Sequence, residues 1–199
     1  MSIDYYDKNS EKFIEDTFNL NMELLYEPFE KELKEGDTIL DIGCGSGRDS
    51  KYFAEKGYDV YAHDGSVEMV GQTQRYIGDK AKLATFEEFD VKELYGRDIE
   101  FDGMWACASL LHIEEENMRM VISKYLKFLK TGGVFFMSFK MRNENHVKGG
   151  RIFTNYTRGK LENLLLGFEE LTILEIVETM DVRDGREDEG WISAIVRKR

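Results

Sequence analysis

Ile39-Leu40-Asp41-Ile42-Gly43-Cys44-Gly45-Ser46-Gly47-Arg48 is the stretch that decides the fold. It joins a short apolar run to a turn with glycine at three alternate positions, after which a helical pattern begins. Glycine reaches backbone angles that other residues avoid, and it leaves no side chain where a ligand must approach closely. The stretch therefore predicts a strand, a turn whose backbone binds a nucleotide-like ligand, and a helix. The alternative is a glycine turn that binds nothing.

The spacing of the glycines argues against a nicotinamide dinucleotide as the ligand. The dinucleotide motif is GxGxxG, in which the third glycine lets the helix pack closely on the strand. Counted from Gly43, Arg48 occupies that third position. Asp41 would also repel a diphosphate placed beside it. A nicotinamide oxidoreductase is therefore the weaker interpretation, although it would share the glycine turn.

A second apolar run covers residues 58–64 and ends in Asp64, 23 positions after Asp41. An acid about 20 residues beyond such a turn hydrogen-bonds ribose hydroxyls in folds of this kind. The run therefore predicts a second strand with a ribose-binding carboxylate at its end. The alternative is that Asp64 caps a helix that begins near Ser66.

Two further stretches complete a set of four motifs. Residues 101–113 run from an apolar strand into Leu110-Leu111-His112-Ile113, and residues 129–138 place Leu-Lys-Thr-Gly-Gly before an apolar run. In this order, residues 39–138 resemble the class I S-adenosylmethionine (SAM) methyltransferases, with Thr131 where the family usually has proline. The whole chain is similar in style to the small stand-alone members grouped with the tellurite-resistance methyltransferases. The resemblance implies a Rossmann-like α/β fold: a doubly wound seven-stranded sheet of order 3-2-1-4-5-7-6, with the last strand antiparallel and helices on both faces.

The hydrophobic pattern independently indicates an α/β fold, because strands and helices alternate along the chain. Residues 4–33 have helical spacing, and Pro28 is expected to break or kink that segment. Ligands of open α/β sheets bind at the carboxyl ends of the strands. The expected strands lie near 38–42, 58–63, 81–85, 100–107, 133–140, 171–180 and 191–197, the helices near 47–56, 66–76, 88–95 and 114–130, and the functional loops at 43–49, 64–67, 86–90, 106–112, 140–156 and 181–190.

Length and composition narrow the class of protein. We expect residues 1–199 to form a single domain, with residues 1–35 as a helical lid over the site. The N-terminus is polar and no apolar run approaches the roughly 18 residues of a membrane span, so we expect a cytoplasmic protein. Cys44 and Cys107 lack metal-ligand spacing, and no metal is predicted. The net charge of −12 makes nucleic acid an unfavourable partner. The sequence does not indicate the oligomeric state.

The resemblance implies SAM as the cofactor and suggests which residues contact it. Arg48 would pair with the methionine carboxylate, or be a surface helix residue; Phe86 would contact the adenine, or belong to the core. Glu87 would also lie beside the adenine. The alternative is that Glu87 and Glu88 begin a helix, where acidic residues are favoured by the helix dipole. The full set of cofactor candidates is Asp41, Gly43, Cys44, Gly45, Arg48, Asp64, Gly65, Phe86, Glu87, Ala106 and Cys107.

The acceptor site is predicted from basic residues in loops that should face the SAM sulfur. Such residues favour a pocket for a small anionic molecule, and the alternative is that they are solvated loop charges. The substrate-binding candidates are Lys140, Arg151, Tyr156 and Arg186, with Arg142, Phe153 and Trp191 in the same loops. No catalytic residue is identified with certainty. His112 and Tyr6 are the candidates, and the alternative for His112 is to cap a helix or orient a backbone carbonyl.

The expected function is therefore SAM-dependent transfer of a methyl group, by in-line displacement, to a small acceptor for which the basic loops suggest an anion. Positioning can supply most of the acceleration of such a reaction. Two alternatives stay open: a methyltransferase that acts on tRNA or a protein side chain, and a non-catalytic SAM-binding partner protein.

Overall fold

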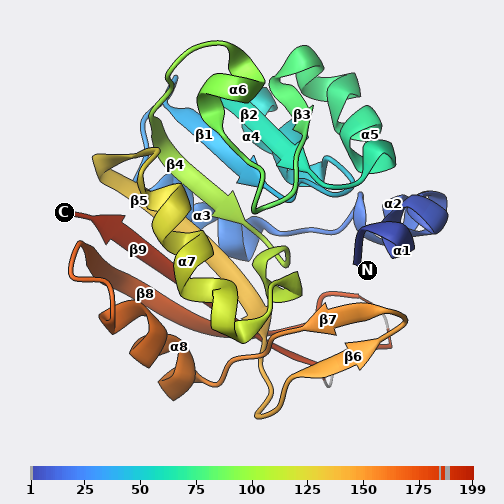
Figure 1. Ribbon diagram of the computed structural model, residues 1–199, viewed down its shortest axis with the longest axis vertical. Helices are drawn as coiled ribbons and strands as arrows, with labels where there is room; N and C mark the ends of the chain where they lie inside the picture. Colours follow the sequence, from blue (N-terminus) through green and yellow to red (C-terminus); the bar gives the residue numbers. More distant parts are fainter. Residues whose placement is uncertain (1, 184, 187–188) are drawn as a thin grey trace.

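A seven-stranded sheet with the strand order β3-β2-β1-β4-β5-β9-β8 organises the computed structural model, which describes residues 2–183, 185–186 and 189–199 (Figure 1). The strands of this sheet are β1 (Thr38–Ile42), β2 (Asp59–Asp64), β3 (Ala81–Leu83), β4 (Phe101–Ala106), β5 (Leu129–Lys140), β8 (Leu171–Met180) and β9 (Gly190–Lys198). The helices are α1 (Ser2–Lys8), α2 (Ser10–Thr17), α3 (Glu23–Glu30), α4 (Arg48–Glu55), α5 (Val67–Ile77), α6 (Val91–Tyr95), α7 (Glu115–Leu126) and α8 (Arg158–Leu166).

The strand directions confirm the predicted topology. β1 to β5 are parallel, whereas β9 is antiparallel to both of its neighbours, β5 and β8. β9 therefore alone runs against the others, and β8 and β9 are the sixth and seventh strands of the order 3-2-1-4-5-7-6. This is the Rossmann-like fold of class I methyltransferases, as the sequence predicted.

Alternate residues of the central strands divide the core between the two faces of the sheet. Leu40 and Ile42 of β1 face α6, α7 and α8, in one buried cluster with Met104, Phe135 and Met137. Neighbouring residues face the other way and pack with α3 and α4; the rings of Trp105 and Phe136 stack there with centroids 3.9 Å apart. Because both faces are covered, the ligand site is left at the ends of the strands.

Several local expectations were wrong. Pro28 lies inside α3, and the helical segment breaks earlier, between α2 and α3. Glu87 and Glu88 do not begin a helix, because α6 starts at Val91 with the Asp90 side chain as its N-cap. Residues 140–156 are not only loop: they include a two-stranded hairpin, β6 (His146–Lys148) and β7 (Arg151–Phe153). Helix α8 was also missed.

The N-terminal helices lie beside the carboxyl ends of the strands. In Figure 1 the arrowheads of β1 and β4 point toward α1, α2 and the β6–β7 hairpin. Contacts join α1 to α5 and to β7. Within the described part of the chain, no helix has the length and apolar character needed to span a membrane.

Candidate functional site

One cavity of about 1160 Å³ lies at the carboxyl ends of the parallel strands. Its wall combines the glycine turn after β1, the ends of β2, β4 and β5, the N-terminal helices, the β6–β7 hairpin and the described part of the 181–190 loop. Residues 184 and 187–188 of that loop lie outside the described residues. A volume of this size exceeds the range of about 300–1,000 Å³ for one small-molecule pocket, so it has room for a cofactor and a second small molecule.

The glycine turn has the backbone that its sequence requires. Gly43, Gly45 and Gly47 have φ angles of +70°, +52° and +76°, which other residues rarely adopt. A Cβ atom on Gly43 would lie 2.6 Å from the Cβ of Ser109 and 3.4 Å from the Phe86 ring. The turn is thus a close-packed cradle, and Gly43, Cys44 and Gly45 line the cavity as predicted.

Asp64 ends β2 beside this cradle and also lines the cavity. Its Oδ2 accepts a hydrogen bond from the Gly45 N–H at 3.0 Å, and its Oδ1 accepts one from the Ser66 N–H at 2.9 Å. Burial raises the pKa of Asp64. The N-cap of α5 is Ser66, whose Oγ accepts from the Met69 N–H, so the helix-capping alternative for Asp64 is wrong. Gly65 follows in the cavity wall, where Ile3 of α1 covers it.

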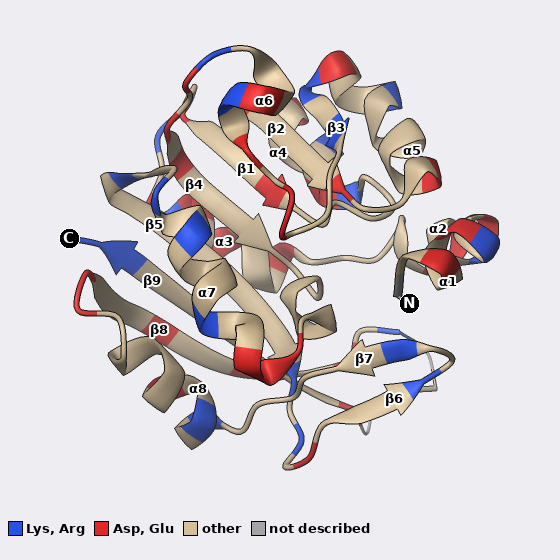
Figure 2. Cartoon of the chain, in the orientation of Figure 1, with Lys and Arg blue, Asp and Glu red and all other residues tan. Residues whose placement is uncertain are grey.

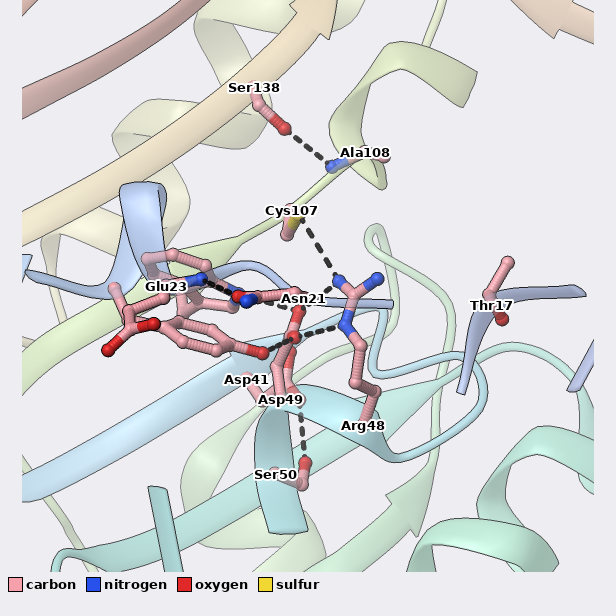
Figure 3. A network of polar contacts seen from close by, with 12 residues as sticks. Thr17, Asn21, Glu23, Asp41, Arg48, Asp49, Ser50, Cys107, Ala108 and Ser138 are labelled. Atoms are coloured by element: carbon pink, nitrogen blue, oxygen red, sulfur yellow. Dashed lines mark hydrogen bonds and ion pairs between the residues drawn. The ribbon is translucent and has the colours of Figure 1, made fainter. Parts of the chain in front are cut away.

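Arg48 and Asp49 form a buried ion pair at the base of the cavity (Figure 3). Arg48 Nε donates to Asp49 Oδ1 at 2.6 Å and Arg48 Nη2 donates to Oδ2 at 2.9 Å. Tyr26 of α3 and Trp105 of β4 donate to the same carboxylate, Trp105 at 2.8 Å. Burial by itself would raise the pKa of Asp49, but Arg48 and these hydrogen bonds hold it below its ordinary value. Arg48 is therefore not a surface residue, and Asp49 is a wall residue that the sequence did not single out.

Two of the predicted cofactor contacts do not reach the cavity wall. Asp41 is 2% exposed and accepts a hydrogen bond from Ser50 Oγ at 2.6 Å, beneath the turn (Figure 3). Ala106 is fully buried in β4, and the wall begins one residue later, at Cys107. Burial, aided by the charge of Asp49, raises the pKa of Asp41. The structure thus gives Asp41 a supporting position under the glycine turn.

The buried position of Asp41 predicts a pH effect on stability. The folded state holds the Asp41 proton more tightly than the unfolded chain, where the pKa of Asp is about 3.9. The free energy of unfolding should therefore fall as the pH rises from about 4 through the raised pKa. Asp41→Asn removes this titration and keeps an acceptor for Ser50. Urea unfolding at about pH 5 and pH 8 should show the variant gaining stability relative to the wild type at the higher pH; parallel pH profiles would contradict the assignment.

The remaining cofactor candidates line the same end of the cavity. Phe86 is half-buried, with its ring 5.9 Å from that of His63, and Glu87 is exposed. Burial raises the pKa of both cysteine thiols, that of Cys107 to about 12. They are therefore neutral thiols at the cofactor end. The buried Oγ of Ser109, beside Gly43, has no hydrogen-bond partner within the described structure, and it faces this end of the cavity.

Tyr6 and His112 are in contact in the cavity wall. The Tyr6 hydroxyl lies 2.7 Å from His112 Nε2, and His112 Nδ1 lies 2.7 Å from the Ile152 carbonyl oxygen. A proton on Nδ1 satisfies that carbonyl and leaves Nε2 to accept from Tyr6. Burial lowers the pKa of His112 to about 4, so the ring is neutral at pH 7. His112 therefore orients a carbonyl, as one alternative held, and also links α1 to the loop after β4.

The other end of the cavity is basic. Lys140 is 8% exposed; it pairs with Glu189, and its ammonium lies 5.5 Å from the centre of the Trp191 ring. The Arg151 guanidinium lies 3.7 Å from the centre of the Tyr5 ring, and its buried Nε has no hydrogen-bond partner in the part of the chain that is described. Arg186 is an exposed lining residue. Lys148 of β6 also lines the cavity, and Figure 2 colours basic residues on both strands of the β6–β7 hairpin.

Tyr156 was placed wrongly. It is 3% exposed and does not line the cavity, because its ring packs against Phe139 at 4.6 Å between centroids. Phe153 and Trp191 do line the cavity. Lys140, Arg151 and Arg186 are thus the three acceptor candidates that the structure brings together.

Comparison with known proteins agrees with this geometry. Residues 39–133 match a family model described as "Methyltransferase domain". The chain is 35% identical over 108 residues to phosphoethanolamine N-methyltransferase 1 of Zea mays, a match that covers 53% of this chain and 21% of the maize protein. It is 34% identical over 89 residues to the putative methyltransferase YqeM of Bacillus subtilis, with 44% and 36% of the two chains covered. The chain therefore matches only about a fifth to a third of the length of these relatives.

Two solved methyltransferase structures align with almost the whole of this chain. One is the 1,6-didemethyltoxoflavin-N1-methyltransferase of Burkholderia thailandensis with bound S-adenosylhomocysteine: the TM-score is 0.77 at 20% identity, and the alignment covers 99% of this chain and 85% of that one. Another is the putative methyltransferase of Haloferax volcanii in complex with the Trm112 activator, with a TM-score of 0.77, 17% identity and 100% and 97% coverage. At such identities the likeness concerns the fold. The chain therefore has the Rossmann-like fold that these solved methyltransferases share, and the methyltransferase-domain model matches its residues 39–133, just under half of its length.

Proposed function

We propose that the protein is a SAM-dependent methyltransferase whose acceptor is a small anionic molecule. The observation that carries the proposal is the continuity of the cavity: one end is a glycine cradle with Asp64 and Arg48, and the other is basic through Lys140 and Arg151. The two ends have room for two ligands in contact. The similarity to the tellurite-resistance group stays a prediction from the sequence.

The cofactor end suits SAM chemically. The cradle at Gly43 would be filled by a Cβ atom, and the orphaned Oγ of Ser109 beside it is available to a ligand. Arg48 would pair with the methionine carboxylate, Asp64 would accept from the ribose hydroxyls, and Phe86 would contact the adenine. When bound, SAM supplies a methyl group on a sulfonium, which a nucleophile can displace in line. The residues of this chain then have to align the acceptor and exclude water.

We assign proton removal from the acceptor to His112 and Tyr6. The neutral His112 ring and the Tyr6 hydroxyl are paired in the wall of the cavity. A neutral imidazole can accept a proton through the hydroxyl, while the Ile152 carbonyl holds the ring in place. We propose these two residues for any step that needs a base.

Two other functions remain distinguishable by experiment. A tRNA acceptor fits poorly with a net charge of −12, because phosphate contacts require a basic surface. A non-catalytic SAM-binding protein would bind the cofactor but release no S-adenosylhomocysteine with any acceptor. Incubation with SAM and a library of small metabolites, followed by measurement of S-adenosylhomocysteine, separates these possibilities.

Ligand binding is expected to stabilise the protein selectively. At 100 times its dissociation constant, S-adenosylhomocysteine should add about 2.7 kcal/mol and raise the melting temperature by roughly 5–10 °C. NAD should give no shift. Asp64→Ala should weaken S-adenosylhomocysteine binding by about 1.5–3 kcal/mol, the range for hydrogen bonds to a charged group. A shift with NAD and none with S-adenosylhomocysteine in differential scanning fluorimetry would overturn the proposal.

We propose residues 1–35 as the lid of this site. Ile3 covers Gly65, Phe13 lies over Gly45, and Ser66 Oγ donates to Asp7 Oδ1 at 2.5 Å. A cover of this kind excludes water from the reacting atoms. Deletion of residues 1–10 should therefore leave the far-UV circular dichroism spectrum close to that of the full chain while weakening S-adenosylhomocysteine binding and turnover. Unchanged affinity and turnover in the truncated protein would show that the segment is a passive tail.

A further inference from the structure

One face of the sheet changes from apolar to cationic along three adjacent strands. Register pairs Phe136 with Ile195, Ser138 with Ser193 and Lys140 with Trp191 between β5 and β9. β8 continues these rows with Glu175, Val177 and Thr179. Alternate residues of a strand face the same side, so all nine residues lie on the face that α3 covers. The row under α3, here called the apolar row, is apolar in β5 and β9 and ends in Glu175 of β8. The serine row comes next and ends in Val177, and the third row, called the cationic row after Lys140, continues with Trp191 and Thr179.

The cationic row is the end already assigned to the anionic group. Lys140 is nearly buried against Trp191, and Arg151 lies close by in the cavity wall with an unpartnered Nε, as far as the described residues show. A buried guanidinium nitrogen without a partner is costly unless a ligand supplies an acceptor. This end thus fits a carboxylate or a phosphate group.

The apolar row leads away from this end toward solvent. Leu24 and Leu25 line the cavity, and behind them Val177 and Ile195 border only a small pocket of about 10 Å³. Leu24 is 78% exposed, and the exposed side chains of Met180 and Val182 also line the cavity. Single exposed apolar residues are common, but here three from two distant segments border one opening. Their placement supplies a nonpolar surface beside a cationic one.

The serine row joins the two regions. Ser138 Oγ accepts from the Ala108 N–H at 2.8 Å, which places this row beside the end of β4. Ser193 is 3% exposed, its Oγ has no hydrogen-bond partner in the described part of the chain, and the residue lines the cavity. We expect a ligand that extends from Lys140 toward Leu24 and Leu25 to pass over Ser193.

We propose that the acceptor is an amphipathic anion: a carboxylate or phosphate group bound at Lys140 and Arg151, with an alkyl or aryl group that crosses Ser193 and packs against Leu24, Leu25 and Met180 in the cavity wall. This inference rests on the proposed function and specifies its substrate class. The proposal excludes small, fully polar anions as the preferred acceptors, because they would leave the apolar side chains of the site in contact with water.

The test is a series of straight-chain carboxylates from acetate to octanoate, titrated calorimetrically into the protein saturated with S-adenosylhomocysteine. Affinity should rise by up to about fourfold for each added methylene group until the chain covers the apolar side of the cavity wall. Leu24→Asp should remove most of this dependence on chain length. The matched control is Leu166→Asp, which changes a 71% exposed leucine of α8 that does not line the cavity, and it should leave the series unchanged.

Three outcomes would count against the inference. Equal affinities along the series, or an unchanged slope in Leu24→Asp, would overturn it while the proposed function stands. Tighter binding of the uncharged alcohols of the same length would overturn the anionic end. Failure of S-adenosylhomocysteine to bind at all, measured first in the same titration, would overturn the proposed function and this inference with it.

Discussion

Asp49→Ala will lower the free energy of unfolding by about 3–5 kcal/mol, because it leaves a buried arginine without its counter-charge. It will also leave the donors of Tyr26 and Trp105 without an acceptor. These donors come from α3 and β4, so the loss affects both the helix that covers the sheet and the central strand. The melting temperature should fall by roughly 6–20 °C for a chain of this length.

The control is Asp98→Ala, and the free energies of unfolding of the two variants are compared by guanidinium denaturation. Asp98 pairs with Lys92 at 3.4 Å, and its side chain is 85% exposed, so removal of this pair should change stability by well under 1 kcal/mol. If both alanine variants lost the same small amount, Asp49 would not be the anchor of the cofactor end.

Arg151→Ala will reduce kcat/KM for the acceptor found by metabolite screening by about 3 kcal/mol or more, that is, ~150-fold. The reason is the loss of a guanidinium whose buried Nε has no hydrogen-bond partner among the described groups and would be paired by the acceptor. S-adenosylhomocysteine affinity should change little, because the cofactor end is built from the turn after β1 and the end of β2. Arg151→Lys keeps the charge and should recover part of the loss.

Arg158→Ala is the matched control for this variant. Arg158 is an exposed arginine of α8, paired with Glu162 and Glu178 and outside the cavity wall, so its loss should leave kcat/KM unchanged. A loss in Arg151→Ala that appears equally in cofactor affinity and acceptor use would indicate a structural role for Arg151 rather than acceptor binding.

The sequence predicted the fold well because its signals are local. The glycines of residues 43–47 require positive φ angles, and the run of apolar residues before them is a strand in any α/β arrangement. Strand β8 was predicted with its observed bounds, Leu171–Met180. Short elements were not predicted. The β6–β7 hairpin has three residues in each strand, too few for a periodic hydrophobic pattern to appear.

The site was predicted less well because residues of the cavity wall and residues of the core are only one or two positions apart in the sequence. Asp41 and Ala106 lie on the strands, whereas Gly43 and Cys107, just beyond them, line the cavity. Asp49 was missed because an acid in the first turn of a helix looks like a dipole-favoured surface residue. Only its contacts with Tyr26 and Trp105, distant in sequence, show that it is buried.

The inner position of β9 has a consequence for how the chain reaches its native state. β9 pairs with β5 on one side and with β8 on the other. β8 therefore joins the sheet only when β9 has paired with β5. The pairing of Val134 with Arg197 closes a long loop, which slows its formation relative to the βα units that precede it. We expect the half of the sheet from β3 to β5 to assemble first and the β8–β9 hairpin to dock on it late. Until it does, β5 presents an unpaired edge of aromatic residues, which is the state in which this protein is most prone to aggregate.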